Sequence, residues 1–316
     1  MFVASNHSVA PRPHAVDLVL VMLDLDARAQ PRPCGCSSPD PGTAVWHEAG
    51  HTGRRCACGL VYLDPPTTIS AVTPDRHYDG YYALPAELRL DWVTRSCTGG
   101  RLLEVGPGTG HLLAAARRRG FEVAGVDPNP ASVRRIAARL GVAIEHATIE
   151  TSALPDAAFD VVVHVDLLAH LADPVVALRA MARRLRPGGH MCFEVGLNGA
   201  ISPLWYRALG RLDFPVHRWL FSLASIERIL ARAGLTIVAT RRFGLVPALG
   251  LVMAKRVAGA RAMQIAGHPH DPEGLPPTQN AAHRLYERAM FVLRYRVGRF
   301  APDVGPQTMF VTARAS

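Results

Sequence analysis

The amino-acid sequence predicts an α/β protein with a doubly wound, mainly parallel sheet of seven strands and helices on both of its faces. Apolar runs alternate with helical segments through the middle of the chain, which is typical of parallel sheets. The first of these runs breaks into glycines at Gly106, Gly108 and Gly110, and the second ends at Asp127. A strand, a glycine turn, a helix and a second strand in this order bring a ligand close to the backbone. We therefore expect a nucleotide-type cofactor site.

The strands are expected at seven places, with helices in most of the intervals. The helix after the glycines spans 109–119. Asp173 followed by Pro174 predicts another helix start, because the carboxylate caps it and proline suits its first position. The segment 186–189 predicts a stop followed by a turn. The expected strands are 101–105, 122–126, 142–146, 159–164, 189–195, 235–242 and 307–313.

The glycine motif, LLEVGPGTG at 102–110, favours a cationic ligand over a pyrophosphate. A dinucleotide fingerprint has the spacing Gly-x-Gly-x-x-Gly, whereas these glycines alternate and follow an acid, Glu104. Pyrophosphate binds to free amides in a positive potential, and Pro107 has no amide hydrogen. The alternative is a glycine turn in an unrelated α/β protein, with Asp127 as an ordinary turn residue.

From about 101 to 243, and again in its last strand, the chain resembles the class I S-adenosylmethionine-dependent methyltransferases, which have a Rossmann-like sheet. The resemblance rests on the glycine motif, on the acid that follows it, on LPDAAFDVVV at 154–163 and on LRPGG at 185–189. It implies S-adenosylmethionine as the cofactor. The residues expected to hold it are Glu104, Gly106, Gly108, Gly110 and, on the ribose hydroxyls, Asp127.

The resemblance also places adenine contacts in the loop after the third strand. Thr148 stands where the family often has an acid, so a hydroxyl replaces a carboxylate. Ile149 and Pro128 are candidate apolar walls for the ring, although each is equally suited to the protein core. His164, which opens the segment after the fourth strand, completes the expected cofactor contacts.

Two histidines are candidates for the acceptor side, and the first is His170. It ends a segment that resembles the family's Leu-Glu-His, with Ala169 in place of Glu. If this segment is helical, Asp166 and His170 lie at i and i+4 on one face and can pair. A packing or capping histidine is the alternative.

His217 is the first choice for a general base or acceptor ligand. It lies in LDFPVHRWLFS, which resembles the family's Pro-x-His followed by an aromatic residue and Ser. Arg218 is placed to meet an anionic group. The alternative for His217 is that it closes its loop onto the sheet.

Four cysteines form two Cys-x-Cys pairs: Cys34, Cys36, Cys56 and Cys58. Two pairs of thiolates suit tetrahedral zinc, and disulfides are rare in cytosolic proteins. The segment resembles a small cysteine module found in many methyltransferases of this type, whose usual pair is Cys-x-x-Cys. His47 and His51 are further candidate ligands. Reduced cysteines without a metal, a disulfide and a catalytic thiol are the alternatives.

The chain divides into five expected units. Tyr78, Tyr81 and Tyr82 in the linker are candidate lid or substrate residues, or packing aromatics. We expect translation to begin at Met22. The units are a disordered or mis-annotated N-terminus at 1–33, a cysteine-rich module at 34–64, a linker and lid helix at 65–100, the methyltransferase core at 101–244 and 305–316, and a helical cap inserted at 245–304.

Composition is that of a soluble globular protein, with 316 residues of which 49% are hydrophobic. The net charge of +9 comes from arginines spread along the chain, so we expect no nucleic-acid partner. The basic helix of the insertion suits a packed cap better than a membrane surface. The apolar run near the N-terminus is too short for a membrane span and lacks signal-peptide features, which indicates a cytoplasmic protein.

The function expected from these features is transfer of a methyl group from S-adenosylmethionine to oxygen or carbon of a small-molecule acceptor, a sugar or a secondary metabolite. Most of the rate of such a displacement comes from holding the two reactants in line. The alternatives are a scaffold that binds the cofactor without catalysis and, less favoured by the glycine spacing, an NAD-dependent oxidoreductase. The acceptor and the oligomeric state are not specified by the sequence.

Overall fold

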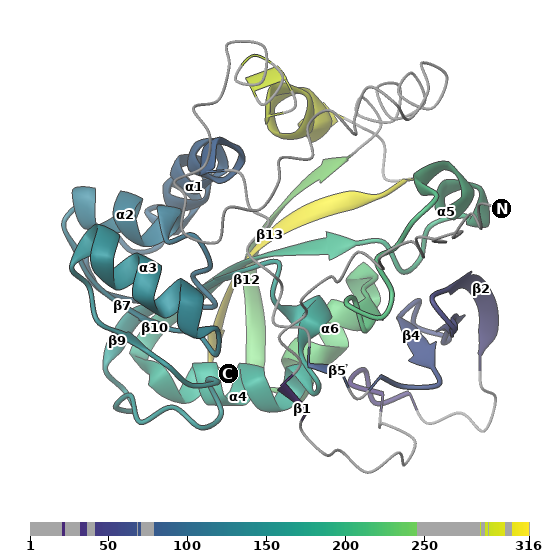
Figure 1. Ribbon diagram of the computed structural model, residues 1–316, viewed down its shortest axis with the longest axis horizontal. Helices are drawn as coiled ribbons and strands as arrows, with labels where there is room; N and C mark the ends of the chain where they lie inside the picture. Colours follow the sequence, from purple (N-terminus) through teal and green to yellow (C-terminus); the bar gives the residue numbers. More distant parts are fainter. Residues whose placement is uncertain are drawn as a thin grey trace, which may run out of the picture.

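The computed structural model describes residues 21–22, 32–36, 42–67, 69–70, 79–244, 285, 288–289, 291–300 and 305–315. A seven-stranded sheet in the order β12-β13-β10-β9-β6-β7-β8 forms its centre (Figure 1). All neighbours are parallel except β13, which is antiparallel to both strands beside it. The mainly parallel sheet expected from the sequence is confirmed. Its strands are β6 Gly100–Val105, β7 Phe121–Val126, β8 Ile144–Glu145, β9 Phe159–Val165, β10 Leu185–Leu197, β12 Leu235–Gly244 and β13 Gln307–Ala315.

Six strands of this sheet lie within two residues of the expected bounds, although β8 is shorter than expected, and β10 differs more. β8 is only two residues long, because the chain leaves the sheet edge after Glu145. β10 begins directly after the preceding helix, and the expected turn at 186–189 lies within it as a register shift between Leu185 and His190. Gly188 has a φ of +79°, which allows the chain to bend there.

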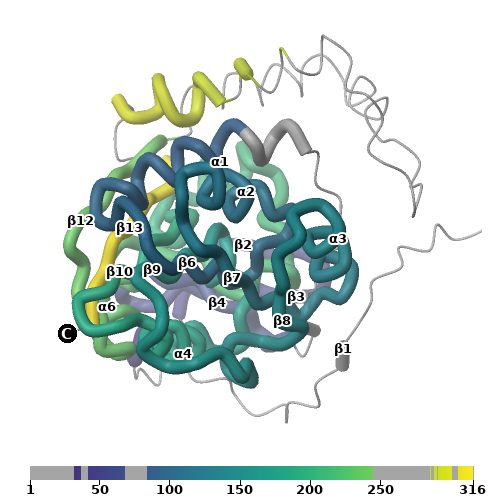
Figure 2. Tube along the Cα trace, turned by 90° about the vertical axis from the view of Figure 1, so that its left-hand side faces the viewer, coloured from purple at the N-terminus to yellow at the C-terminus, as the bar shows by residue number. Residues whose placement is uncertain are grey.

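Helices cover both faces of the sheet (Figures 1 and 2). Side chains of α1, α2 and α3 share a buried cluster with Val161, whereas those of α4 and α6 share another with Val162. The expected cap of α4 is confirmed, because the Asp173 carboxylate accepts hydrogen bonds from the amides of Val175 and Val176. The helices are α1 Asp79–Val93, α2 His111–Arg118, α3 Pro130–Leu140, α4 Pro174–Arg184, α5 Pro203–Leu209 and α6 Leu223–Arg232, with two 3-10 turns, η1 Leu168–His170 and η3 Gly298–Phe300, and a π-helical segment, η2 Val292–Val297.

A smaller sheet, in the order β11-β4-β3-β2, joins the N-terminal segment to a distant part of the chain. β2 (Thr43–Glu48) and β3 (His51–Arg55) form a hairpin whose turn residues have the positive φ angles that tight two-residue turns require. β4 (Val61–Asp64) continues the sheet, and β11 (Trp219–Leu220) completes it. Elsewhere, β1 (Val21–Met22) pairs with β5 (Ile69–Ser70).

The described part of the C-terminal insertion packs on the sheet. Tyr295 is buried, with its ring centroid 5.2 Å from that of Phe243 and 6.0 Å from that of Phe310. Most of the expected cap, 245–284, lies outside the described residues. The segment 291–300 therefore covers the β12 and β13 end of the core.

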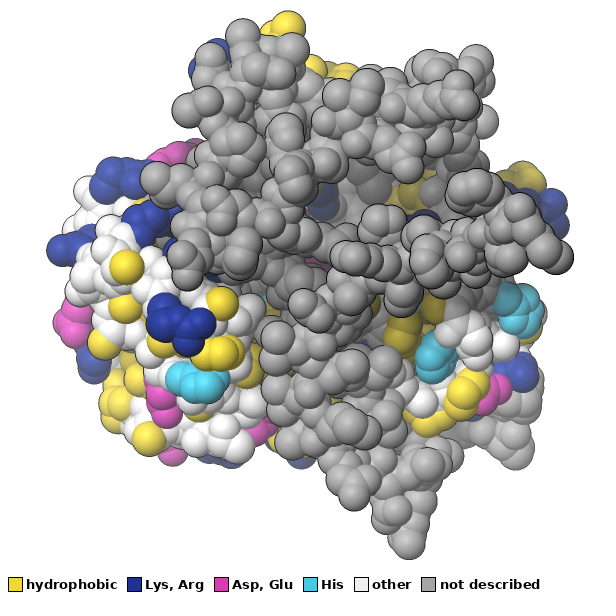
Figure 3. Space-filling model, in the orientation of Figure 1, with side chains coloured by type: hydrophobic (Ala, Val, Ile, Leu, Met, Phe, Trp, Pro, Cys, Tyr) yellow, Lys and Arg dark blue, Asp and Glu magenta, His cyan; other side chains and the backbone are white. Residues whose placement is uncertain are grey.

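Among the described helices, none has the length and apolar character that a membrane span needs. On the face shown in Figure 3, Lys and Arg side chains lie at several separate places, with Asp and Glu side chains near some of them. Among the coloured side chains of this face, the positive charge is therefore scattered.

Candidate functional site

The loop after β6 brings the backbone of three glycines to the carboxyl edge of the sheet. Gly106, Gly108 and Gly110 have φ angles of +69°, +51° and +73°, in the left-handed region that favours glycine. A Cβ on Gly110 would lie 3.0 Å from Cγ1 of Ile136, so this glycine also lets α3 pack closely. The N-cap of α2 is Gly110, which offers no side-chain cap to the first amides of the helix. The loop thus presents open backbone to a ligand.

Asp127 lies directly beside this loop. Its Oδ2 accepts a hydrogen bond from the Gly108 amide at 3.3 Å, and Oδ1 accepts one from the Asn129 amide at 2.8 Å. The two bonds fix the carboxylate at the end of β7, next to the glycines. This is the position expected for a carboxylate that binds ribose hydroxyls.

Glu104 is the buried acid of the site. It lies in β6, the strand that leads into the glycine loop, only 4% of the residue is exposed, and Oε2 has no hydrogen-bond partner among the described residues. Burial raises the pKa of Glu104 to about 8, although the positive charge of Arg89 opposes the shift. A buried carboxylate without a counter-charge at contact distance fits a cationic ligand. The donor set therefore suits S-adenosylmethionine and does not suit a pyrophosphate.

Two arginines of α3 hold the glycine loop from behind, which sequence reasoning missed. The Arg135 guanidinium donates to the Gly108 carbonyl at 2.9 Å, and that of Arg139 donates to the Thr109 carbonyl. Their spacing of four residues places both on one helix face. The guanidinium of Arg135 is thus bound to the backbone of the glycine loop.

The residues expected near adenine lie along the β7 and β8 loops. Pro128 is exposed, and its carbonyl accepts a hydrogen bond from Nε2 of His146 at 3.0 Å, which joins the two loops. The Thr148 hydroxyl is 3.1 Å from that of Thr151. Ile149 is buried in the cluster on the α4 and α6 face, so its described contacts are those of a core residue.

His164 lies inside β9 and not after it. The strand continues to Val165, which pairs with Glu194 of β10. The residue is 0% exposed, its ring is stacked on Phe193 at 4.7 Å, and neither ring nitrogen has a hydrogen-bond partner among the described residues. Burial lowers the pKa of His164 to about 3. Its environment is that of a neutral packing side chain.

His170 and His217 are brought together by the fold, with ring centroids 4.9 Å apart. Nδ1 of His170 donates to the Val216 carbonyl at 3.1 Å, and Nδ1 of His217 donates to the Leu212 carbonyl at 2.8 Å. A carbonyl oxygen can only accept, so each ring carries its proton on Nδ1 and its lone pair on Nε2. Burial, then the neighbouring His217, lowers the pKa of His170. The pair therefore offers two basic nitrogens.

The loop that carries His170 touches the glycine loop. A Cβ on Gly106 would lie 3.3 Å from Cδ1 of Leu167, so the two loops meet at the same edge of the sheet. The segment is a three-residue 3-10 turn, so the helical pairing expected for Asp166 and His170 does not form. Arg218 is buried and donates to the Thr67 carbonyl at 2.8 Å, which gives its guanidinium a structural contact.

A buried network of charged side chains joins α1 to β10. Arg89 of α1 donates to the Glu194 carboxylate at 2.6 Å, and the Tyr295 hydroxyl donates to its other oxygen at 3.2 Å. Burial alone would raise the pKa of Glu194, but Arg89 and Arg294 hold it below its usual value. Sequence reasoning missed this network, whose members lie in three distant segments. Of the tyrosines expected in the lid, Tyr78 and the side chains of Tyr81 and Tyr82 lie outside the described residues.

The four cysteines converge as expected, with all Sγ atoms within 4.8 Å of one another. Sγ of Cys56 is 3.7 Å from that of Cys34 and 3.1 Å from that of Cys58. Hydrogen bonds from Cys34 and Cys58 lower the pKa of Cys56 to about 5, whereas burial raises that of Cys58 to about 11. Tetrahedral zinc, with bonds of about 2.3 Å, needs sulfurs about 3.8 Å apart. The cluster can therefore hold a zinc ion after small movements.

His47 and His51 do not belong to this cluster. They lie near the tip of the β2–β3 hairpin, where Nδ1 of His51 is 2.8 Å from the Pro65 carbonyl and that of His47 is 3.1 Å from the Thr52 hydroxyl. Cys56 follows the opposite end of the hairpin. The expectation that these histidines are ligands is therefore wrong for the described geometry.

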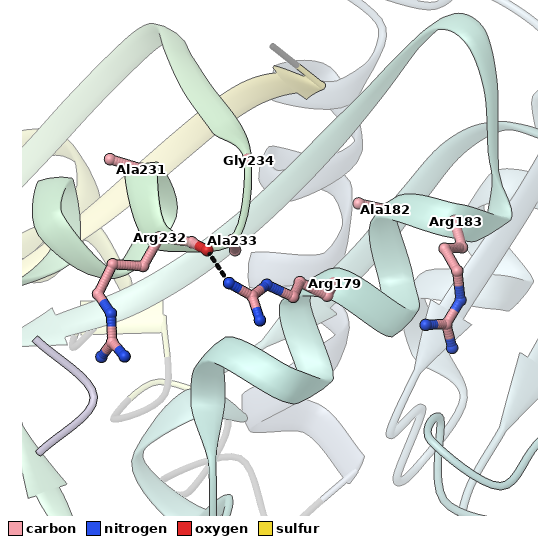
Figure 4. A pocket seen from close by; sticks show the side chains of 7 residues that line it. All are labelled: Arg179, Ala182, Arg183, Ala231, Arg232, Ala233 and Gly234. Atoms are coloured by element: carbon pink, nitrogen blue, oxygen red, sulfur yellow. Dashed lines mark hydrogen bonds between the residues drawn. The ribbon is translucent and has the colours of Figure 1, made fainter. Parts of the chain in front are cut away.

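A shallow groove between the ends of α4 and α6 lies at the opposite edge of the sheet (Figure 4). Arg179 donates to the Arg232 carbonyl at 2.6 Å and so caps α6, as the dashed line shows. The Arg232 side chain points away, and its guanidinium donates to the carbonyls of Arg32 and Pro33. Both guanidinium groups thus bind backbone carbonyls, one at the end of α6 and the other in the segment before Cys34.

Comparison with known proteins finds relatives of this chain in sequence. A family model described as a methyltransferase domain matches residues 76–240. The ubiquinone biosynthesis O-methyltransferase of Alkalilimnicola ehrlichii is 39% identical over 117 residues, 34% of this chain and 47% of that protein. The protein of the same name from Ralstonia nicotianae is 36% identical over 115 residues, 34% of this chain and 48% of its own. The chain thus spans about half the length of these curated relatives.

Among solved structures, one from Galdieria sulphuraria, described provisionally as a sarcosine dimethylglycine methyltransferase, has a TM-score of 0.50. The match covers 74% of this chain and 86% of that one at 16% identity, so the two proteins are similar in fold alone.

Proposed function

The chain belongs to the class I S-adenosylmethionine-dependent methyltransferases, and from this premise we propose that it methylates a hydroxyl oxygen of a small-molecule acceptor. The proposal rests on the neighbouring side chains of His170 and His217, each of which has a lone pair on Nε2. The loop that carries His170 meets the glycine loop at the same edge of the sheet. A hydroxyl has a proton to lose, and a neutral imidazole is suited to take it.

On the donor side, bound S-adenosylmethionine supplies a methyl group on a positively charged sulfur. The glycine loop admits the ligand to the backbone, and Asp127 would hold the ribose hydroxyls. A cation bound beside Glu104 favours the ionised form of this carboxyl, and burial leaves the attraction between the two charges little screened by water. These residues orient a cation and fix the direction in which an acceptor must approach.

On the acceptor side, His217 is the proposed base. Its Nδ1 proton is held by the Leu212 carbonyl, so Nε2 accepts the hydroxyl proton as the oxygen attacks. His170 lies beside it, with the ring centroids 4.9 Å apart, and two imidazolium ions this close repel each other, so only one of the two rings takes up an additional proton at a time. Oxygen as the acceptor atom is also favoured by the names of the curated relatives, which are O-methyltransferases.

We also propose that the cysteine cluster holds structural zinc. Four thiolates this close repel one another unless a cation lies between them, and half of them are buried. The sheet that contains the cluster's flanking strands also includes β11, just after His217. The metal would therefore stabilise the support of the acceptor loop.

The test of the function is a transfer assay with methyl-labelled S-adenosylmethionine and a set of hydroxylated probes, including catechol and simple sugars. We expect label in an O-methyl product that mass spectrometry identifies, and loss of product with His217→Gln. Label on nitrogen or carbon only, or product formation unchanged by His217→Gln, would contradict the proposal.

A further inference from the structure

We propose that Glu48, on the N-terminal hairpin, is a positioning residue that holds His217 in its reactive tautomer through the single peptide group between Leu212 and Asp213. This inference rests on the proposed function, in which His217 is the base. It connects a surface hairpin that has no catalytic group of its own to the acceptor side.

The Glu48 carboxylate receives three hydrogen bonds. Its Oε2 accepts from the Leu212 amide at 2.8 Å and from the Trp46 indole at 3.0 Å, and Oε1 accepts from the Asp213 amide at 3.2 Å. Glu48 ends β2, more than 160 residues before its two backbone partners. One carboxylate thus holds two successive amides of the acceptor loop.

The same stretch of backbone holds His217 from its other side. The Leu212 carbonyl accepts the Nδ1 proton of His217 at 2.8 Å, and the Asp213 carbonyl accepts its backbone amide proton at 3.0 Å. In the Leu212–Asp213 peptide group, the N–H therefore points to Glu48 and the C=O points to the imidazole.

This arrangement makes a short polar relay. A carboxylate that accepts from an amide N–H polarises the peptide group, and its carbonyl becomes a stronger acceptor. A stronger acceptor holds the imidazole proton on Nδ1, which keeps the lone pair on Nε2 for the substrate. The role resembles that of the carboxylate in a catalytic triad, with one peptide group inserted between acid and histidine.

The loop needs such support because its backbone is unfavourable on its own. Asp213 has a φ of 62°, a left-handed conformation that non-glycine residues adopt only when their surroundings hold them there. Glu48 binds the amide of this residue. After His217, β11 pairs with β4, so the N-terminal segment holds the loop on both sides of the histidine.

The direct test is nitrogen NMR of the full-length protein, which reports which ring nitrogen of a histidine carries the proton. The signals of His217 are identified from their loss in His217→Gln. We expect the Nδ1–H form in the wild type and a mixture containing the Nε2–H form in Glu48→Gln, which keeps the shape of the side chain. A wild-type pattern in Glu48→Gln would overturn the proposal.

Asp64→Asn is the matched control, because Asp64 lies in the same small sheet but its carboxylate pairs with Arg54. We expect it to keep the wild-type tautomer, with melting temperatures measured for both variants. Equal tautomer changes in both variants would mean general loosening and would contradict a specific role for Glu48.

With an acceptor found in the transfer assay, Glu48→Gln should lower kcat about 10-fold to 100-fold while KM for S-adenosylmethionine changes by less than about twofold. An unchanged kcat would overturn the proposal. The NMR test needs neither cofactor nor acceptor, so failure of the proposed function and failure of the Glu48 relay are distinguishable.

Discussion

The Arg135 guanidinium of α3 donates a hydrogen bond to the Gly108 carbonyl at 2.9 Å. The same glycine gives its amide to the Asp127 carboxylate at 3.3 Å. The two peptide groups that flank Gly108 are therefore both held, one by the carboxylate of Asp127 and the other by the guanidinium of Arg135. This explains how a loop of three left-handed glycines keeps one conformation.

Arg135→Ala should weaken binding of S-adenosylhomocysteine about 10-fold, because a hydrogen bond from a charged donor contributes about 1.5–3 kcal/mol. Arg134→Ala is the matched control, since Arg134 is the preceding residue and is exposed. Calorimetric titration measures both. Equal affinities of the two variants would contradict the role assigned to Arg135.

Glu104→Gln should make the unliganded protein more stable at alkaline pH. The pKa of Glu104 is raised from 4.5 to about 8, so its favourable state is the protonated one. Stability is then fully present below about pH 4.5 and is lost as pH rises through about 8. We expect the free energy of unfolding of the variant to exceed that of the wild type by about 1–3 kcal/mol at pH 9.

The same substitution should weaken binding of S-adenosylmethionine more than that of S-adenosylhomocysteine, which lacks the positive charge on sulfur. Glu122→Gln serves as the control, because this glutamate is exposed on the next strand. Denaturant titrations at several pH values and calorimetry measure the two effects. Parallel stability curves for Glu104→Gln and wild type would show that the carboxyl is not buried as described.

His164→Phe should stabilise the protein against acid. Burial holds the pKa of His164 near 3, below its usual 6.5, so the unfolded chain binds a proton that the folded one does not. Stability is therefore lost as pH falls from about 6.5 towards 3. Phenylalanine has no such proton and keeps the stack on Phe193. Thermal unfolding between pH 7 and pH 5 should show a smaller decrease for the variant, and an identical decrease would contradict this account.

His217→Gln should lower kcat by about 10²-fold to 10⁴-fold, the usual contribution of a general base. Its effect on the affinity for S-adenosylhomocysteine should be small, because the contacts described for the donor side do not include it. His146→Gln is a histidine control at the same edge of the sheet, near the expected adenine loop. Single-turnover rates distinguish the two, and equal losses in both variants would argue against a base.

Cys56→Ser should remove zinc from the protein. Wild-type protein purified without chelators is expected to contain stoichiometric zinc by elemental analysis, and Cys97→Ser should retain it, since Cys97 lies outside the cluster. Loss of the metal should also lower the melting temperature. Wild-type protein free of zinc would refute the metal site.

The elements that sequence predicts well are those with local signals. Each of these signals involves residues that lie close together in the sequence, so a short stretch of sequence reveals it. They are the alternate glycines, the acid at the end of β7 and the cap at Asp173. The convergence of the four cysteines is also predictable, because two closely spaced pairs of thiols are typical of a metal site.

The relationships that sequence does not predict join distant segments. Nothing near Glu48 indicates that its carboxylate binds the amides of Leu212 and Asp213, because that contact depends on β11 pairing with β4. The same holds for Arg89 with Glu194. β9 ends one residue beyond the expected strand 159–164, since buried strands lack the alternation that marks their ends.

The central claim is that the glycine loop, Glu104 and Asp127 form a site for S-adenosylmethionine and not for a dinucleotide. Calorimetric titration of the wild-type protein with S-adenosylhomocysteine and, separately, with NAD tests it most directly. We predict saturable binding of S-adenosylhomocysteine, abolished in Gly108→Arg, and no binding of NAD. Binding of NAD without binding of S-adenosylhomocysteine would contradict the account.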